Sequence, residues 1–112
     1  MLKIEAIIQP FKLDDVMDAL KDSGIEGVTV LTARGHGQQK GHTEVYRGRE
    51  YNIDLLRKVK LEIVIPPERK DDVIRTLTEA ARTGSIGDGK IFISSIKDAV
   101  RIRNMDRGDA AL

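Results

Sequence analysis

The chain has 112 residues, a length that suits one domain with a core of its own. Its 19 basic and 18 acidic residues leave a net charge of +1, and its aromatic residues are two Tyr and two Phe. This composition excludes a nucleic-acid binder that relies on a strong positive field or on base stacking. The absence of cysteine excludes disulfides, zinc fingers and thiol catalysis, and fits a cytoplasmic protein. No apolar run approaches the roughly 20 residues of a membrane span.

The first part of the chain predicts a strand, a helix and a second strand. Residues 2–8 alternate between polar and apolar and end in an apolar run, which predicts a strand. A helix follows, because apolar residues recur at i, i+3, i+4 and i+7, and Ser23-Gly24 ends it. Residues 28–33 are rich in β-branched types and predict the next strand. The helical stripe consists of Leu13, Val16, Met17 and Leu20.

The same plan restarts at Lys58. Residues 58–65 alternate as a strand with one core face, and Pro66-Pro67 ends it because proline cannot donate to the ladder. A second amphipathic helix follows, ended by Thr83-Gly84, and strands are predicted at 91–96 and at 100–103. The stripe of this helix consists of Val73, Ile74, Leu77, Ala80 and Ala81.

These two parts are an internal repeat with an offset of 57 residues. In that register Pro10 meets Pro67, and Asp14-Asp15-Val16 meets Asp71-Asp72-Val73. Two βαβ units of this kind predict an α+β fold, a ferredoxin-like sandwich with two helices on one face of an antiparallel sheet. The opposite sheet face would carry Ile7, Ala33 and Val64, which indicates self-association.

A long segment, about 36–57, separates the halves and shows neither helical nor strand periodicity. Loops of this length inside a domain are usually functional or disordered. A passive insertion is the alternative interpretation, but Tyr46, Arg47, Arg49 and Tyr51 are poor residues for a spacer.

Glycine-rich segments indicate anion binding. The loop at about 82–90 contains Gly84-x-x-x-x-Gly89-Lys90, which fails as a P-loop because Ile91 replaces the hydroxyl residue and a strand follows the loop. Its backbone N–H groups and Lys90 still suit an anion, although an ordinary turn fits this segment equally well. A second glycine-rich segment, 34–41, follows a strand. Arg101 and Arg103 would share one strand face, where they suit phosphate oxygens, although a solvated strand face is the alternative interpretation of a single pair. Together the three features predict nucleotide or polyphosphate binding.

Enzymatic interpretations have little support in the residue pattern. His36 and His42 lie in the long loop, and no Ser–His or carboxylate–His spacing places either on a rigid element. The paired aspartates at 14–15 and 71–72 occupy first helical turns, where carboxylates favour the helix dipole. A small nucleotide-processing enzyme on the same fold stays the alternative to a non-enzymatic sensor.

Two stretches closely resemble the PII nitrogen-regulatory family: Tyr46-Arg-Gly-Arg-Glu-Tyr51 and Thr83-Gly-Ser-Ile-Gly-Asp-Gly-Lys-Ile-Phe92. The likeness covers essentially the whole chain, 1–112, as a single domain. It implies a homotrimer of ferredoxin-like subunits with ATP or ADP bound in clefts between neighbours. It also implies that the long loop is a mobile signalling arm, and that ATP with Mg²⁺ creates a site for 2-oxoglutarate.

The resemblance also implies roles for single residues. Phosphates would be held by Gly87, Asp88, Gly89 and Lys90, and Arg101 and Arg103 would reach in from the C-terminal segment, 101–112, of the adjoining subunit. The adenine pocket would consist of Thr29, Glu62 and Val64.

At the base of the arm, Gly35, Gly37 and Gln38 would contact the nucleotide. Gln39 would complete the coordination of Mg²⁺ and 2-oxoglutarate, and Lys58 would pair with a carboxylate of 2-oxoglutarate. Lys40 would bond with Glu62 or with the effector region.

Partners follow from the same likeness. Arg47 would enter the cytoplasmic exit of an ammonium-transporter pore, so that a cytoplasmic protein becomes reversibly membrane-associated. Enzymes of nitrogen metabolism are further expected targets, and Tyr51 is the expected modification site of a nucleotidyltransferase.

Four positions depart from the usual family pattern. His36 replaces a common phenylalanine, Gln38 a common arginine, Arg49 a common small residue and Ser85 a common lysine. Gln38 bears on the triphosphate contact, and Arg49 leaves no serine there for phosphorylation.

Overall fold

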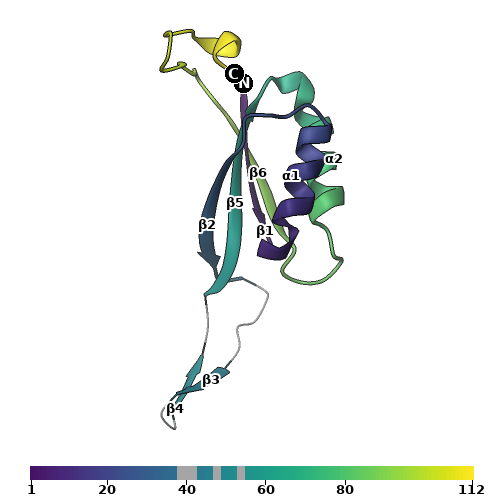
Figure 1. Ribbon diagram of the computed structural model, residues 1–112, viewed down its shortest axis with the longest axis vertical. Helices are drawn as coiled ribbons and strands as arrows, with labels where there is room; N and C mark the ends of the chain where they lie inside the picture. The colour runs from purple at the N-terminus through teal and green to yellow at the C-terminus, as the bar shows by residue number, and fades with distance from the viewer. Residues whose placement is uncertain (38–42, 47–48, 53–54) are drawn as a thin grey trace.

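The computed structural model describes residues 1–37, 43–46, 49–52 and 55–112, with the backbone alone for 43–46 and 49–52. Strands β1 (Leu2–Ile8), β2 (Thr29–Gly35), β5 (Leu56–Ile65) and β6 (Gly89–Ser95) form an antiparallel sheet in the order β2-β5-β1-β6. Helices α1 (Leu13–Asp22) and α2 (Lys70–Ala81) lie together on one face of it (Figure 1). The predicted ferredoxin-like double βαβ arrangement is confirmed.

The internal repeat is visible in how the two helices begin. A 3-10 turn, η1 (Pro10–Lys12), leads into α1, and its counterpart η2 (Pro67–Arg69) leads into α2 at an offset of 57 residues. Proline opens both turns because its fixed φ suits a first helical position and its missing N–H would have no partner there. Neither α-helix has a side-chain N-cap, and paired aspartates in each first turn face the positive end of the helix dipole.

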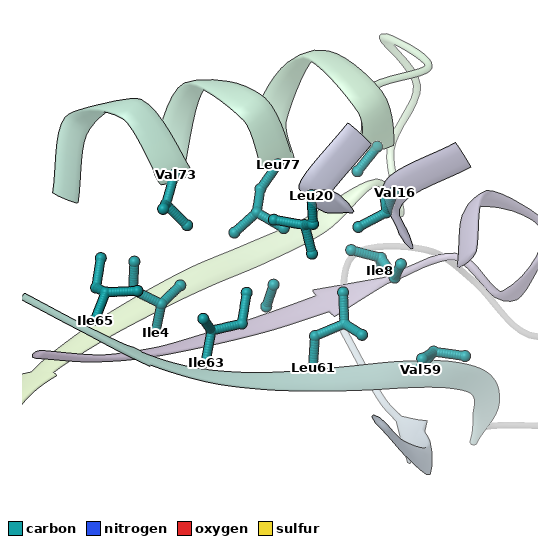
Figure 2. Close-up of a cluster of buried hydrophobic side chains, with 12 residues drawn as sticks. Ile4, Ile8, Val16, Leu20, Val59, Leu61, Ile63, Ile65, Val73 and Leu77 are labelled. Carbon is teal, nitrogen blue, oxygen red and sulfur yellow. The ribbon is translucent and has the colours of Figure 1, made fainter. Parts of the chain in front are cut away.

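Twelve apolar residues of the described ranges form the core between sheet and helices (Figure 2). Alternate residues of β1 and β5 point toward the helices, and the helical stripes close over them. Burying a side chain of this size contributes about 1.5–3 kcal/mol, so this layer supplies most of the driving force for folding. The core consists of Ile4, Ala6, Ile8, Val16, Leu20, Val59, Leu61, Ile63, Ile65, Val73, Leu77 and Ala81.

The long loop lies between the two halves, as expected, and part of it is regular although its sequence shows no strand periodicity. Strands β3 (Thr43–Tyr46) and β4 (Arg49–Asn52) pair antiparallel as a separate two-stranded sheet, and β5 already begins at Leu56. Residue types such as Val45, Tyr46 and Tyr51 favour extended backbone even where polar and apolar residues do not alternate.

The expectation of a strand at 100–103 is wrong, because residues 102–104 form a turn. Val100 forms an isolated bridge with Arg107, and the chain turns before Met105, which has a φ of +64°. The backbone N–H of Asp106 donates to Asn104 Oδ1 at 3.1 Å, a local bond that competes with a strand ladder. The C-terminal segment then ends in a short 3-10 helix, η3 (Gly108–Ala111).

The sheet face opposite the helices, called the outer face here, carries a charged network between apolar residues. Glu5 and Glu62 are directly opposite each other on β1 and β5, and Lys60 Nζ lies 3.3 Å from one carboxylate and 3.1 Å from the other. Lys3 pairs with Glu5 at 2.7 Å, and hydrogen bonds from both lysines lower the pKa of Glu5. By their register Ile7, Ala33 and Val64 share this face, as expected, together with the exposed Leu31 and Phe92.

Candidate functional site

The glycine loop, residues 82–90, is organised by the carboxylate of Asp88. The backbone N–H groups of Thr83 and Gly84 each donate to Asp88 Oδ2 at 2.8 Å, and the Thr83 hydroxyl donates to Oδ1. These hydrogen bonds, that of the Thr83 hydroxyl above all, lower the pKa of Asp88. The carboxylate is therefore engaged within the loop, so Asp88 would meet an anion through its backbone N–H.

Positive φ angles allow this loop to turn sharply before β6. Gly84, Gly87 and Gly89 have φ values of +90°, +102° and +106°. At Gly89 a Cβ atom would lie 1.6 Å from the carbonyl oxygen of Ile7, because the loop enters the sheet directly beside β1. Glycine is thus required at 89 both by the backbone conformation and by the contact with β1.

A cleft of about 450 Å³ separates the glycine loop from the ends of β2 and β5. Lys58 spans it, since its Nζ donates to the carbonyl oxygen of Gly87 at 2.9 Å. Burial lowers the pKa of Lys58, and the charge of Asp88 acts in the opposite direction. The structure thus brings seven of the predicted site residues to one cleft: Gly35, Gly37, Lys58, Gly87, Asp88, Gly89 and Lys90.

Five further residues line the cleft. Ile7, Leu56 and Phe92 add apolar surface, while His36 and Ser85 are two of the positions that depart from the family pattern. Strand parity would have found Ile7 and Phe92, because both share the outer face with Lys90. Leu56 was not foreseen, since it lay inside the segment expected to be irregular.

Other predicted site residues lie away from this cleft in the same chain. Thr29 is paired with Glu62 across β2 and β5, and Val64 follows two residues later on the outer face. Lys58 and Val64 are about 20 Å apart along the strand, at roughly 3.3 Å per residue. The expected adenine pocket of one chain is therefore remote from that chain's own glycine loop.

Arg101 and Arg103 of the C-terminal segment do not share a strand face, contrary to the expectation. Arg101 donates to Asp106 Oδ2 at 3.2 Å and to the carbonyl oxygen of Ala110 at 2.9 Å. Arg103 lies on the turn, is exposed, and makes no hydrogen bond or ion pair within the described part of the chain. The turn at 102–104 removes the strand that would have aligned them.

Several predicted residues fall outside the described residues: Gln38, Gln39, Lys40 and Arg47. Tyr51 is opposite Glu44 in the β3–β4 pairing, and the described structure includes its backbone alone. Within the described ranges no three His, Cys, Asp or Glu side chains gather as a metal site, and no helix there is long and apolar enough to span a membrane.

Comparison with known proteins decides the family. The family model described as "Nitrogen regulatory protein P-II" matches residues 1–106. The chain belongs to the P-II family. It is 55% identical over all 112 residues to the P-II protein of Rhodobacter capsulatus. It is also 54% identical, over the full length of both chains, to P-II of Haemophilus influenzae and to P-II 1 of Escherichia coli.

Family membership fixes the class of function. P-II proteins are nitrogen-regulatory signal transducers and not enzymes, and full-length identity of this degree assigns that function to the chain. The alternative of a nucleotide-processing enzyme is thereby set aside. The P-II likeness predicted from the two sequence stretches is confirmed.

Proposed function

We propose that this P-II protein senses ATP and ADP in the cleft at the glycine loop and, with Mg-ATP bound, 2-oxoglutarate. The observation that carries this proposal is the convergence of the loop, Lys58 and Lys90 with Gly35 and Gly37 on one cleft. Because glycine has no side chain, phosphate oxygens can approach the backbone N–H groups of the glycines around the cleft closely, and the two lysines supply positive charge.

Lys90 is the side chain best suited to a phosphate. It is exposed, lines the cleft, and has no hydrogen-bond or ion-pair partner among the described residues. An ammonium in that position gives up no protein contact when it binds an anion. Lys58, in contrast, already bonds to Gly87 and would be drawn toward a second ligand, such as a carboxylate of 2-oxoglutarate.

The site is completed, in this proposal, by a neighbouring subunit of a homotrimer. Thr29, Glu62 and Val64 lie far along the outer face from the cleft of their own chain, and Arg103 is exposed without a partner in the described part of the molecule. These residues would serve the cleft of the next subunit. Exposed apolar residues such as Leu31 and Phe92 on the outer face support such packing.

The donor set of the cleft suits phosphate rather than a bare cation. Its described side chains include two lysines, and Asp88, its one carboxylate, is engaged by Thr83 and Gly84. Mg²⁺ would be held mainly by phosphate oxygens, as is usual for this ion, with the amide oxygen of Gln39 as protein ligand. Its chemistry would be to join the triphosphate to 2-oxoglutarate.

The long loop would carry the signal to targets. In this proposal Arg47 plugs the cytoplasmic exit of an ammonium-transporter pore, or the loop binds an enzyme of nitrogen metabolism. A nucleotidyltransferase acting on Tyr51, four residues after Arg47 in the sequence, would add a bulky anion and hinder insertion sterically and electrostatically. The protein would then be cytoplasmic and bind the membrane reversibly through its partner.

Calorimetric titration with ATP and with ADP tests the nucleotide site. Lys90→Ala removes a charge-assisted contact worth about 1.5–3 kcal/mol, so we expect both affinities to fall roughly 10- to 150-fold. Lys97→Ala is the matched control, because Lys97 is exposed and lies outside the cleft. Unchanged nucleotide affinity in Lys90→Ala would contradict the proposal.

A further inference from the structure

Arg34 and Arg57 are directly opposite each other where β2 and β5 pair. Two positions farther along the ladder Thr32 is opposite the buried Val59, so strand parity places both arginines on the helix side of the sheet. Directly opposed residues have Cβ atoms about 4.5–5.5 Å apart, and like charges at that spacing are unfavourable.

A second like-charge pair shows how this chain relieves such repulsion. Glu5 and Glu62 are also directly opposed, and the ammonium of Lys60 lies within 3.3 Å of both carboxylates. Among the residues that the structure describes, Arg34 and Arg57 have no corresponding counter-ion. Within the described part of the chain neither guanidinium makes an ion pair or hydrogen bond with a carboxylate.

The two arginines border a hollow of about 420 Å³. Its walls include Pro10 at the start of η1 and the Thr32–Val59 pair. Lys58 lines both this hollow and the glycine-loop cleft, but Arg34 and Arg57 line the hollow alone and lie on the helix side of the sheet, whereas Lys90 lies on the outer face. Both guanidinium groups are exposed and have access to solutes.

We propose that Arg34 and Arg57 form a binding site for a doubly charged oxyanion, a phosphoryl group or a small dicarboxylate. Guanidinium groups present planar pairs of N–H donors that match the oxygens of both ligands, and two of them on neighbouring strands balance two negative charges. The bound anion takes the place that Lys60 holds between the two glutamates. It converts a repulsive cross-strand pair into an attractive one.

NMR of the arginine Nε–Hε groups in the full chain tests this site. Inorganic phosphate and, separately, malonate are titrated while sodium chloride holds the ionic strength constant. We expect the Arg34 and Arg57 resonances to shift together along one saturating curve. A response to phosphate alone assigns the site to phosphoryl groups, one to malonate alone to dicarboxylates, and one to both to oxyanions in general.

Variants separate this site from other cationic surfaces. Arg57→Gln should weaken the response of Arg34 at least about 10-fold, the loss of one charge-assisted contact. Lys97→Gln, with the same change of charge elsewhere, and Lys90→Ala, in the cleft, should leave both resonances responding as in the parent protein. The proposal is overturned if neither anion exceeds the effect of chloride, or if Arg34 responds equally well in Arg57→Gln.

A stability measurement shows that these variants are folded and tests the repulsion itself. At low ionic strength and without added anion, Arg57→Gln should unfold at the same temperature as the parent or higher, because it removes a like-charge contact. Phosphate or malonate should then raise the unfolding temperature of the parent more than that of the variant. A variant that unfolds earlier and is stabilised equally by the anion would count against the site.

Discussion

The ammonium of Lys58 donates a hydrogen bond of 2.9 Å to the carbonyl oxygen of Gly87, and so joins β5 to the glycine loop across the cleft. Burial lowers the pKa of Lys58, which means that its charge is partly desolvated and in need of acceptors. Any anionic ligand of Lys58 would compete with, or add to, the carbonyl of Gly87. The position of the glycine loop is therefore coupled to whatever binds Lys58.

Replacing Lys58 with methionine tests this coupling. The variant keeps an unbranched side chain but removes the donor to Gly87, so we expect the loop at 84–89 to become more mobile. Backbone order parameters from NMR relaxation should fall from about 0.85 toward about 0.6 in that loop. Lys60→Met is the matched control, since Lys60 shares the outer face but bonds to Glu5 and Glu62. Equal loop order in both variants would show that Gly87 does not depend on Lys58.

Gly89→Ala should be among the most damaging single substitutions in the described structure. A Cβ at 1.6 Å from Ile7 O cannot be accommodated without separating β6 from β1, and a φ of +106° adds strain for any L-residue. We expect a loss of about 3 kcal/mol or more in the free energy of unfolding, measured by urea denaturation.

Two other glycines serve as controls for Gly89. A Cβ at position 84 would meet open space, but the positive φ of Gly84 should make Gly84→Ala lower the free energy of unfolding by about 1–2 kcal/mol. Gly37 has neither a positive φ nor a close contact, so Gly37→Ala should leave the stability nearly unchanged. A Gly89→Ala protein no less stable than Gly84→Ala would contradict the contact with Ile7.

The sequence predicted the sheet, both helices and the repeat because their periodicities report a single core. Val16 and Leu20 have the spacing of one helix face, and Val59 and Leu61 have the spacing of one strand face; all four are buried. This spacing is a local property of the sequence and does not depend on residues far along the chain. The error at 100–103 has a different source. Alternation in Val100-Arg-Ile-Arg103 resembles a strand. Farther along, however, the side chain of Asn104 accepts a hydrogen bond from the backbone N–H of Asp106 and donates one to the Asp106 carboxylate, which favours a turn.

The site was only partly predictable for a similar reason. Glycine spacing and Lys90 mark the loop locally, so their meeting with Gly35 and Gly37 needed only the fold. The Asp88 carboxylate accepts hydrogen bonds from the backbone N–H groups of Thr83 and Gly84. These bonds depend on the path of the backbone through the loop, which cannot be read from the spacing of residues in the sequence.

Acidification should release the Asp88 carboxylate from the glycine loop. Hydrogen bonds from Thr83 and Gly84 lower the pKa of Asp88, so the folded loop favours the charged form. The charged Asp88 carboxylate therefore stabilises the folded chain. This stabilisation is complete above the pKa that Asp88 has in the unfolded chain, about 3.9, and is lost as the pH falls through the lower pKa of the folded chain. We expect the amide resonances of Thr83 and Gly84 to shift with a midpoint below pH 3.9.

The variant Asp88→Asn identifies the titrating group. Its amide oxygen still accepts a hydrogen bond but carries no charge, so the acid transition of the Thr83 and Gly84 amides should disappear. A midpoint at or above the ordinary pKa of aspartate, or a transition that persists in Asp88→Asn, would show that these amides report another carboxylate.

The C-terminal arginines should separate in their effects on stability and on nucleotide binding. Arg101 holds the C-terminal segment through Asp106 and the carbonyl oxygen of Ala110, whereas Arg103 is exposed on the turn without a partner in the described structure. Arg101→Gln should therefore lower the free energy of unfolding by about 1 kcal/mol, and Arg103→Gln should leave it unchanged. Thermal unfolding measures this difference.

Nucleotide affinity gives the second half of the comparison. If Arg103 completes the cleft of a neighbouring subunit, Arg103→Gln loses a charge-assisted phosphate contact, and ATP should bind roughly 10- to 150-fold more weakly in calorimetry. Lys97→Gln again controls for the change in net charge. Parent-like ATP binding by Arg103→Gln would remove this residue from the nucleotide site, and an equal loss of stability in both arginine variants would refute the division of roles. A stable Arg103→Gln protein that binds ATP poorly would show that the Arg103 side chain contributes to nucleotide binding and not to folding stability.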